Sequence, residues 1–378
     1  MDPQSLIGPE SPLGYPAPYW LMAVLKVLGF TLHATAMGLW YAGIPVALLL
    51  RWRGGQSRLL SRRLMNPMPV IIALGINFGI VPLLFLQVMY YQAFYPATIL
   101  MAWPWFGVIA LLMLAYYGVY IYVVGLRRDT LTKPRAAAGW AAMIAFLVIG
   151  FLFANAMSLT VNVDAWAEIW RSTSEAGAPL GTALNTGDPS LWPRWLMTFG
   201  LSLATVGAFL VVDAAFFARN ESSDYRTWAG RMAGNVYTVG FVWFAATGLW
   251  YTLGTWPMAV KDAMFGGPLL VLTILTAAAP GLVWLLLMRT RSAVPSKGLA
   301  LGVAIGQFGV IGLNAVSRQV VQNIELAPYL NVAGETVDVQ WSPMLLFLAL
   351  FVIGAGVIIW MVRRAVVESQ RQAGGSSA

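Results

Sequence analysis

Cysteine is absent from this chain of 378 residues, and histidine occurs once, as His33. Without cysteine, the chain has no disulfide framework, no thiolate zinc site and no cysteine-ligated iron–sulfur cluster. A single histidine also excludes any metal site built from several histidines. Charged residues are scarce as well, at 10% against 59% hydrophobic residues. Such a composition leaves little classical metal chemistry and cannot form the surface of a soluble protein.

Apolar runs long enough to cross a bilayer recur along the whole chain. Windows of about 19 residues predict about nine transmembrane helices, near 20–50, 67–94, 98–125, 137–160, 194–217, 233–255, 267–289, 297–321 and 343–362. The expected fold is therefore an all-α integral membrane protein, a single polytopic domain over 1–378. Residues 1–19 are polar and rich in Pro and Gly, so no cleavable signal is expected and the first span directs insertion. Residues 372–378 are expected to form a flexible tail.

Basic residues gather in alternate connections. Of the 23 Lys and Arg residues, 18 fall in five segments that hold only 4 Asp and Glu residues, at 51–63, 127–135, 219–231, 289–297 and 363–371. The positive-inside rule then predicts an N-terminus outside and a C-terminus in the cytoplasm. The net charge of +8 is thus a matter of topology, and we expect no nucleic-acid partner. The other 5 cations are Lys26, Arg171, Arg194, Lys261 and Arg318.

One extracytoplasmic loop is sizeable, at residues 161–193. It carries the acids Asp164, Glu168, Glu175 and Asp188, and a short interfacial helix is expected around Trp166 and Trp170. One interpretation is a cap anchored on the bilayer surface by its tryptophans. The other is a docking face for an extracytoplasmic subunit. A second outer segment, 323–341, is expected on the same side.

Polar side chains inside the spans are informative, because each costs free energy in lipid unless it has a partner. The Asn and Gln side chains predict hydrogen bonds between helices. Lys26 and Arg318 fall near outer span ends, where a long side chain can reach the interface. Asp213 falls near the cytoplasmic end of its span, beside Arg219.

His33 lies in the stretch "GFTLHATAMGLW", about 13 residues or roughly 20 Å along the first span, near the middle of a bilayer about 30 Å thick. At that depth the imidazole is expected to be neutral. It is either a core histidine that donates to a carbonyl or the axial ligand of a haem b. Bis-histidine ligation is excluded, whereas five-coordinate or His–Met ligation is allowed.

Four stretches resemble, in order, subunit I of cytochrome bd quinol oxidases. They are "LKVLGFTLHATAMGLWYAGIPVALLL", "LGINFGIVPLLFLQVMYY", "TVGAFLVVDAAFFARNESSDYRTWAGRMAGNVYTVGF" and "NAVSRQVVQN". That family has nine spans, an outside N-terminus, a first-span histidine that ligates haem b, a "GINF" motif in the second span and a "GRQPW" motif near the eighth. The resemblance implies a multi-pass protein of the bacterial cytoplasmic membrane, with His33 as the ligand of one haem b at most.

The chain departs from the family at several sites. The carboxylate that ligates haem d in the family falls near Met89, in a stretch with Gln87 and no acid. The fifth span has no histidine, and the loop after the sixth span is short. Of the "GRQPW" motif only Arg318 and Gln319 remain. The resemblance therefore implies cofactor contacts at these four residues, but not a working quinol oxidase.

These observations leave three hypotheses. The chain is a membrane subunit of an electron-transfer complex, which links the quinone pool to periplasmic c-type cytochromes docked on the outer face. Alternatively, it is a haem-free anchor or scaffold of such a complex. The third hypothesis, a transporter, lacks paired broken helices and a midplane acidic pair. In each case the expected partners include other membrane subunits and membrane lipids, some of them structural.

Overall fold

The computed structural model describes residues 3–289 and 293–374. Within these ranges, 9 helical segments are long and apolar enough to cross a membrane, which confirms the prediction of an all-α, multi-pass membrane protein. Of the expected flexible tail, residues 372–374 belong to the last helix, and residues 375–378 lie outside the described residues.

Two spans end in a π-helical turn, and a third, the first span, consists of two consecutive helices. The spans are α1 (Tyr19–Tyr41) with α2 (Gly43–Arg51), α4 (Met68–Met89), α6 (Ala102–Arg127), α7 (Lys133–Val161), α9 (Leu191–Val212) with the π-helical turn η3 (Asp213–Phe217), α10 (Ser223–Leu249) with the π-helical turn η4 (Trp250–Thr255), α12 (Leu269–Met288), α13 (Lys297–Leu326) and α14 (Trp341–Gly374). The shorter elements are η1 (Pro3–Leu6), α3 (Gly55–Met65), α5 (Tyr91–Leu100), η2 (Val163–Ala165), α8 (Trp166–Ser172), the hairpin strands β1 (Ser174–Glu175) and β2 (Ala178–Pro179), and α11 (Met258–Met264).

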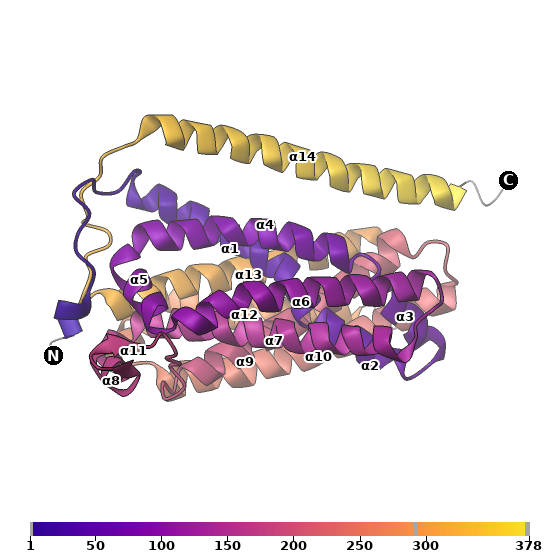
Figure 1. The fold of residues 1–378 in the computed structure, drawn as a ribbon. Coiled ribbons are helices and arrows are strands. Elements are labelled where there is room, and N and C mark those ends of the chain that lie inside the picture. The colour runs from indigo at the N-terminus through magenta and orange to yellow at the C-terminus, as the bar shows by residue number, and fades with distance from the viewer. Residues whose placement is uncertain (1–2, 290–292, 375–378) are drawn as a thin grey trace.

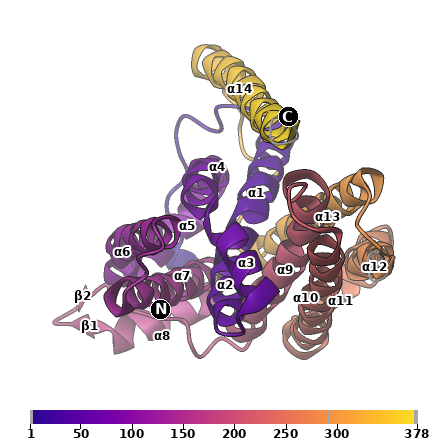
Figure 2. The same ribbon diagram turned by 90° about the vertical axis from the view of Figure 1, so that its right-hand side faces the viewer.

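The spans α1 to α13 pack side by side along a common axis, and α14 stands apart from them (Figures 1 and 2). None of the residues in the apolar window of α14 is buried. Phe347 of α14 packs edge-on against Phe85 of α4, with ring centroids 5.6 Å apart. The ninth span is therefore a peripheral helix, and the core lies among the other eight.

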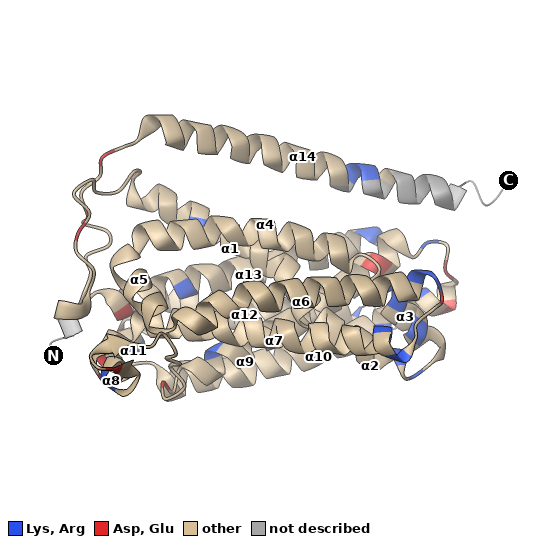
Figure 3. Ribbon diagram, in the orientation of Figure 1, with Lys and Arg blue, Asp and Glu red and all other residues tan. Residues whose placement is uncertain are grey.

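Charge separates the two ends of the bundle (Figure 3). Most Lys and Arg residues lie at the end that carries α3, whereas α8, α11 and the described N-terminal residues lie at the opposite end. We call these the basic end and the acidic end. The described residues of the basic connections thus share one end of the bundle, as their alternation along the chain predicts. Which end faces the cytoplasm stays a prediction.

Two segments that are distant in sequence pair at the acidic end. The backbone N–H of Tyr15 donates to the carbonyl of Thr336 at 2.7 Å, and that of Asp338 donates to the carbonyl of Tyr15 at 2.9 Å. A Cβ at Gly14, whose φ is +62°, would lie 2.5 Å from the Thr336 oxygen, so only glycine fits this approach. We call this pairing the outer clasp.

The 161–193 loop is tied down by an internal polar network. The Asp188 carboxylate accepts hydrogen bonds from the hydroxyls of Ser158 at 2.6 Å and Ser190 at 2.9 Å. The expected short helix is α8, but Trp166 is only 1% exposed and its Nε1 donates to the Leu159 carbonyl at 2.8 Å. The interpretation of Trp166 as a bilayer anchor is therefore wrong, because its indole fills the space between α7 and the loop.

An ion-pair cluster lies at the basic end. Arg63 donates to both carboxylate oxygens of Asp213, at 2.7 and 2.8 Å, and to Glu221 at 3.4 Å. Burial opposes the charge of Arg63, but its bonds and attraction to Asp213 and Glu221 outweigh burial and raise its pKa. The partner of Asp213 is thus Arg63 from the α3 segment, not the expected neighbour Arg219.

Candidate functional site

A cavity of about 410 Å³ lies inside the bundle. Its walls come from α1, α4, α6, α7, α9, η4 and α13. This volume falls within the range of about 300–1,000 Å³ that is usual for pockets holding small molecules and cofactors. Its lining is largely apolar, with charged side chains gathered toward the acidic end of the bundle.

One face of α1 forms a wall of the cavity. The cavity is lined by five residues of α1 that follow one another at intervals of three or four, namely Lys26, Phe30, His33, Met37 and Trp40. Because that spacing places side chains on one stripe of a helix, the sequence fixes which residues share the wall. Lys26 and His33 are two turns apart, or roughly 10 Å along the axis.

Among the residues that the structure describes, the His33 ring has one hydrogen-bond partner. Its Nδ1 lies 2.8 Å from the backbone oxygen of Gly75 on α4. A carbonyl can only accept, so Nδ1 carries the proton and Nε2 keeps its lone pair. A Cβ at Gly79 would lie 2.8 Å from Nδ1, so this glycine lets the imidazole lie against α4. The expectation of a neutral histidine that donates to a carbonyl agrees with this geometry.

The "GINF" motif, Gly75 to Phe78, is the part of α4 that receives His33 and its neighbour Trp40. A Cβ at Gly75 would lie 2.1 Å from the Trp40 ring, so the indole occupies the space that a side chain would need. The rings of His33 and Trp40 meet edge to face, with centroids 6.0 Å apart. Ile76 lines the cavity, whereas Asn77 is exposed and donates to the Ala73 carbonyl of its own helix.

Charged side chains line the cavity at its acidic end. Arg194 of α9 forms an ion pair with Glu325 of α13, with side chains 17% and 11% exposed. Lys26 donates to Gln322 at 2.8 Å, and its Nζ lies 4.4 Å from the centre of the Tyr90 ring. The Arg318 guanidinium lies 4.7 Å from the centre of the Phe30 ring. Lys26 and Arg318 therefore line the cavity rather than reach for the bilayer interface.

Among the other residues implied by the family resemblance, only Gln319 joins Arg318 and His33 in the cavity wall. Its Nε2 donates to Asn323 at 3.1 Å and to the Tyr90 hydroxyl, and its Oε1 is buried without a hydrogen-bond partner among the described residues. Burial raises the pKa of Tyr90, which keeps its hydroxyl neutral and able to donate in this network.

Gln87 and Met89 lie elsewhere. Neither Gln87 nor Met89 lines the cavity. Gln87 accepts a hydrogen bond from the Tyr95 hydroxyl at 3.4 Å. Met89 is 1% exposed and packs in the apolar core near the acidic end, where its carbonyl accepts from the Tyr15 hydroxyl at 2.7 Å. The structure thus does not bring these two residues to the candidate site.

Sequence reasoning missed Arg194, Glu325 and Tyr251 as site residues, although all three line the cavity. A usable signal was present, because Arg194 is one of the cations outside the basic connections. Three of those cations line the cavity, namely Lys26, Arg194 and Arg318. A cation that topology does not explain is therefore informative in a membrane protein.

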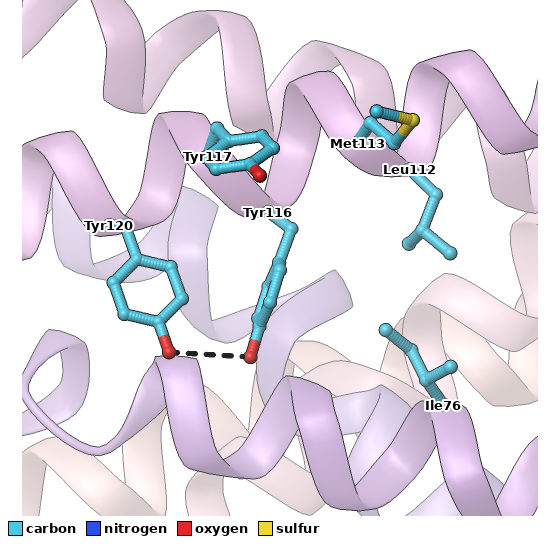
Figure 4. A pocket seen from close by; sticks show the side chains of 6 residues that line it. All are labelled: Ile76, Leu112, Met113, Tyr116, Tyr117 and Tyr120. Atoms are coloured by element: carbon cyan, nitrogen blue, oxygen red, sulfur yellow. Dashed lines mark hydrogen bonds between the residues drawn. The ribbon is translucent and has the colours of Figure 1, made fainter.

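A second hollow lies outside the cavity, on the face of the bundle between α4 and α6. It measures about 300 Å³ and is lined by tyrosines of α6 together with apolar side chains (Figure 4). The Tyr116 and Tyr120 hydroxyls lie 3.4 Å apart, and Tyr116 also donates to the Pro69 carbonyl at 3.2 Å. Ile76 and Leu112 line both hollows. The cavity wall here is thus one side chain thick.

The residues present suit a haem better than a multi-ligand metal ion. Among the described residues, no three His, Cys, Asp or Glu side chains come together. The cavity combines a histidine with a free Nε2, apolar and aromatic walls, and the thioethers of Met37, Met157 and Met197. An imidazole that donates its other N–H to a carbonyl is the usual arrangement of a histidine that binds a metal.

No protein-family model matches the chain, and no curated protein matches it.

Proposed function

We propose that this protein is the membrane subunit of an electron-transfer complex and that it holds one haem b at His33. One observation carries the proposal: the only histidine presents a free Nε2 to an apolar cavity of about 410 Å³ inside a transmembrane bundle. A satisfied core histidine explains the bond to Gly75. It gives no reason for the space on the other side of the ring.

Other residues of the chain have defined parts in this proposal. The Gly75 carbonyl fixes the tautomer and the orientation of the His33 ring. The rings of Trp40 and Phe146 lie 5.9 Å apart and line the cavity beside His33. In this proposal they keep water from that part of the cavity. A haem bound here would supply a one-electron carrier. A low-dielectric pocket is one of the means by which a protein tunes the reduction potential of a haem.

The partner at the acidic end is proposed to be a c-type cytochrome with a basic rim, and the complex to exchange electrons with the quinone pool of a bacterial cytoplasmic membrane. Asp164, Glu168 and Glu175 are exposed there. Arg171 is the exposed cation among them, and it pairs with Glu168. Complementary charge steers such encounters and raises association rates. Asp188 has no part in docking, since the loop network engages it.

The experiment is haem quantification on the purified full chain, by reduced-minus-oxidised spectra and pyridine haemochrome analysis. We expect haem b in the wild type and its loss in His33→Ala. Met89→Leu is the matched control, because Met89 is buried outside the cavity and a Met-to-Leu exchange nearly conserves volume. A haem-free wild type overturns the proposal and leaves the anchor or scaffold hypothesis. Full haem retention in His33→Ala overturns the ligand assignment.

A further inference from the structure

The charges at the acidic end of the cavity do not balance. The carboxylate of Glu325 is engaged by Arg194. Arg318 has neither a carboxylate nor a hydrogen-bond partner among the described residues, and its contact is the ring of Phe30. A guanidinium stays protonated in proteins, so Arg318 carries an uncompensated positive charge within a transmembrane helix. Such charges in membrane proteins are paired or serve a ligand.

The geometry directs this charge at the cavity. Arg318 keeps exposed surface although it lies deep in the bundle, because it lines the cavity. Lys26 lines the same end and uses one of its N–H groups for Gln322, which leaves others free. Arg194 is engaged by Glu325 and adds no free charge here. Donors from α1 and α13, on Lys26 and Arg318, thus line the space without an acceptor for their remaining N–H groups among the described residues.

We propose that the acidic end of this cavity binds the carboxylate or phosphate oxygens of an acidic amphiphile, whose apolar body extends toward His33. The shape of the site supports an amphiphile over a free anion, because the charged end continues into walls of Phe30, Phe146 and Phe153. Access from the bilayer supports the same class of ligand, since Ile76 and Leu112 line both the cavity and the second hollow on the face of the bundle. The inference stands without a haem.

Two sources can supply this chemistry, the propionates of a haem b and the headgroup of an acidic phospholipid. The test is solvent extraction of the full chain purified in mild detergent, with haem measured as pyridine haemochrome and phospholipids by mass spectrometry. We expect the wild type to retain a stoichiometric amount of one of the two. Haem in the extract assigns the first source, and acidic phospholipid without haem assigns the second while it overturns the haem proposal.

The decisive variant is Lys26→Met with Arg318→Met. Loss of charge-assisted hydrogen bonds should lower retention of the amphiphile about tenfold or more. Arg171→Met with Lys261→Met is the matched control, because both cations also lie outside the basic connections but do not line the cavity. Equal retention in the two double variants, or a wild type that holds neither haem nor acidic phospholipid, overturns the inference.

A second measurement does not depend on the double variant. Wild-type protein is reconstituted in nanodiscs of phosphatidylcholine, and phosphatidylglycerol or haem b is then added. We expect one of the two to raise the unfolding temperature, with a midpoint that falls at high salt, and expect Arg318→Lys to keep most of this stabilisation. No stabilisation by either addition contradicts the inference even if the double variant fails to fold.

Discussion

Replacement of Gly75 by alanine tests how closely α1 and α4 depend on each other. The added Cβ would lie 2.1 Å from Cζ3 and 2.5 Å from Cη2 of Trp40, whereas ordinary van der Waals contact begins at 3.4 Å. The indole or the helix must therefore move by about 1 Å or more. Trp40 is 6% exposed and its ring contacts the rings of His33 and Phe146, so a shift of the indole disturbs both contacts.

The magnitude follows from two opposing terms. Overpacking a close-packed core costs about 1–3 kcal/mol, and alanine regains about 0.5–1 kcal/mol over glycine inside a helix. The contact at Gly75 is far inside the forbidden range, so the cost lies near the upper limit. We expect a net destabilisation of about 2–2.5 kcal/mol, which is a factor of about 30–70 in the folded-to-unfolded ratio.

The assay is reversible unfolding in mixed micelles, monitored by tryptophan fluorescence. Gly309→Ala is the matched control, because a Cβ there meets nothing within 4 Å. That variant should be as stable as the wild type or slightly more stable, because alanine is more favourable than glycine inside a helix and no steric cost opposes this gain. If Gly75→Ala unfolds at the same denaturant concentration as Gly309→Ala, the steric argument for the α1–α4 contact is refuted.

Three further predictions concern charge and sidedness. Asp213→Asn should cost about 1–3 kcal/mol of stability, because it removes the closer of the two carboxylates that pair with the half-buried Arg63. Asp129→Asn should cost under about 1 kcal/mol, because its ion pair is exposed. In intact cells, cysteine at the exposed Ser172 should react with an impermeant reagent and cysteine at the exposed Gln56 should not; the reverse pattern overturns the proposed orientation. The rate of electron exchange with a basic c-type cytochrome should fall, and lose its salt dependence, when amides replace the exposed acids Asp164, Glu168 and Glu175. An unchanged rate contradicts the docking proposal.

Hydropathy was sufficient to predict the spans, because a bilayer requires long apolar helices and leaves few alternatives. Interhelical hydrogen bonding by Asn and Gln was also predictable in kind. Gln307 confirms it, since its side chain donates to Thr205 at 3.1 Å and accepts from Tyr237 at 2.9 Å. A polar side chain inside a span needs a hydrogen-bond partner, so the sequence predicts that a partner exists but does not predict which residue it is.

The position of the charged side chains was less predictable. Lys26 and Arg318 have stems long enough to reach either the interface or the interior, so sequence alone leaves both open. The choice depends on what other helices place beside them, here Tyr90 and Phe30. The π-helical turn that carries Tyr251 into the cavity is equally invisible to hydropathy, because it arises from packing at the end of α10.

The sequence predicted the candidate site from its one distinctive residue, but it did not predict which other residues line the site. A lone histidine at mid-span indicated where to look, and the spacing of α1 implied its neighbours on that helix. Gln87 and Met89 were inferred by counting along a distant resemblance, and a shift of one or two residues along a helix separates facing the cavity from facing elsewhere. Arg194 and Glu325 come from α9 and α13, so only the tertiary fold brings them to His33.

The outer clasp also has a consequence for biogenesis. Tyr15 emerges early in translation, whereas its partner Thr336 is made more than 300 residues later, which is roughly 15–60 s at 5–20 residues per second. Until then the N–H and carbonyl of Tyr15 lack the acceptor and donor that hold them in the finished protein. This segment is made before the nine spans and is therefore among the last to be fixed, and a truncation before residue 336 leaves it unpaired.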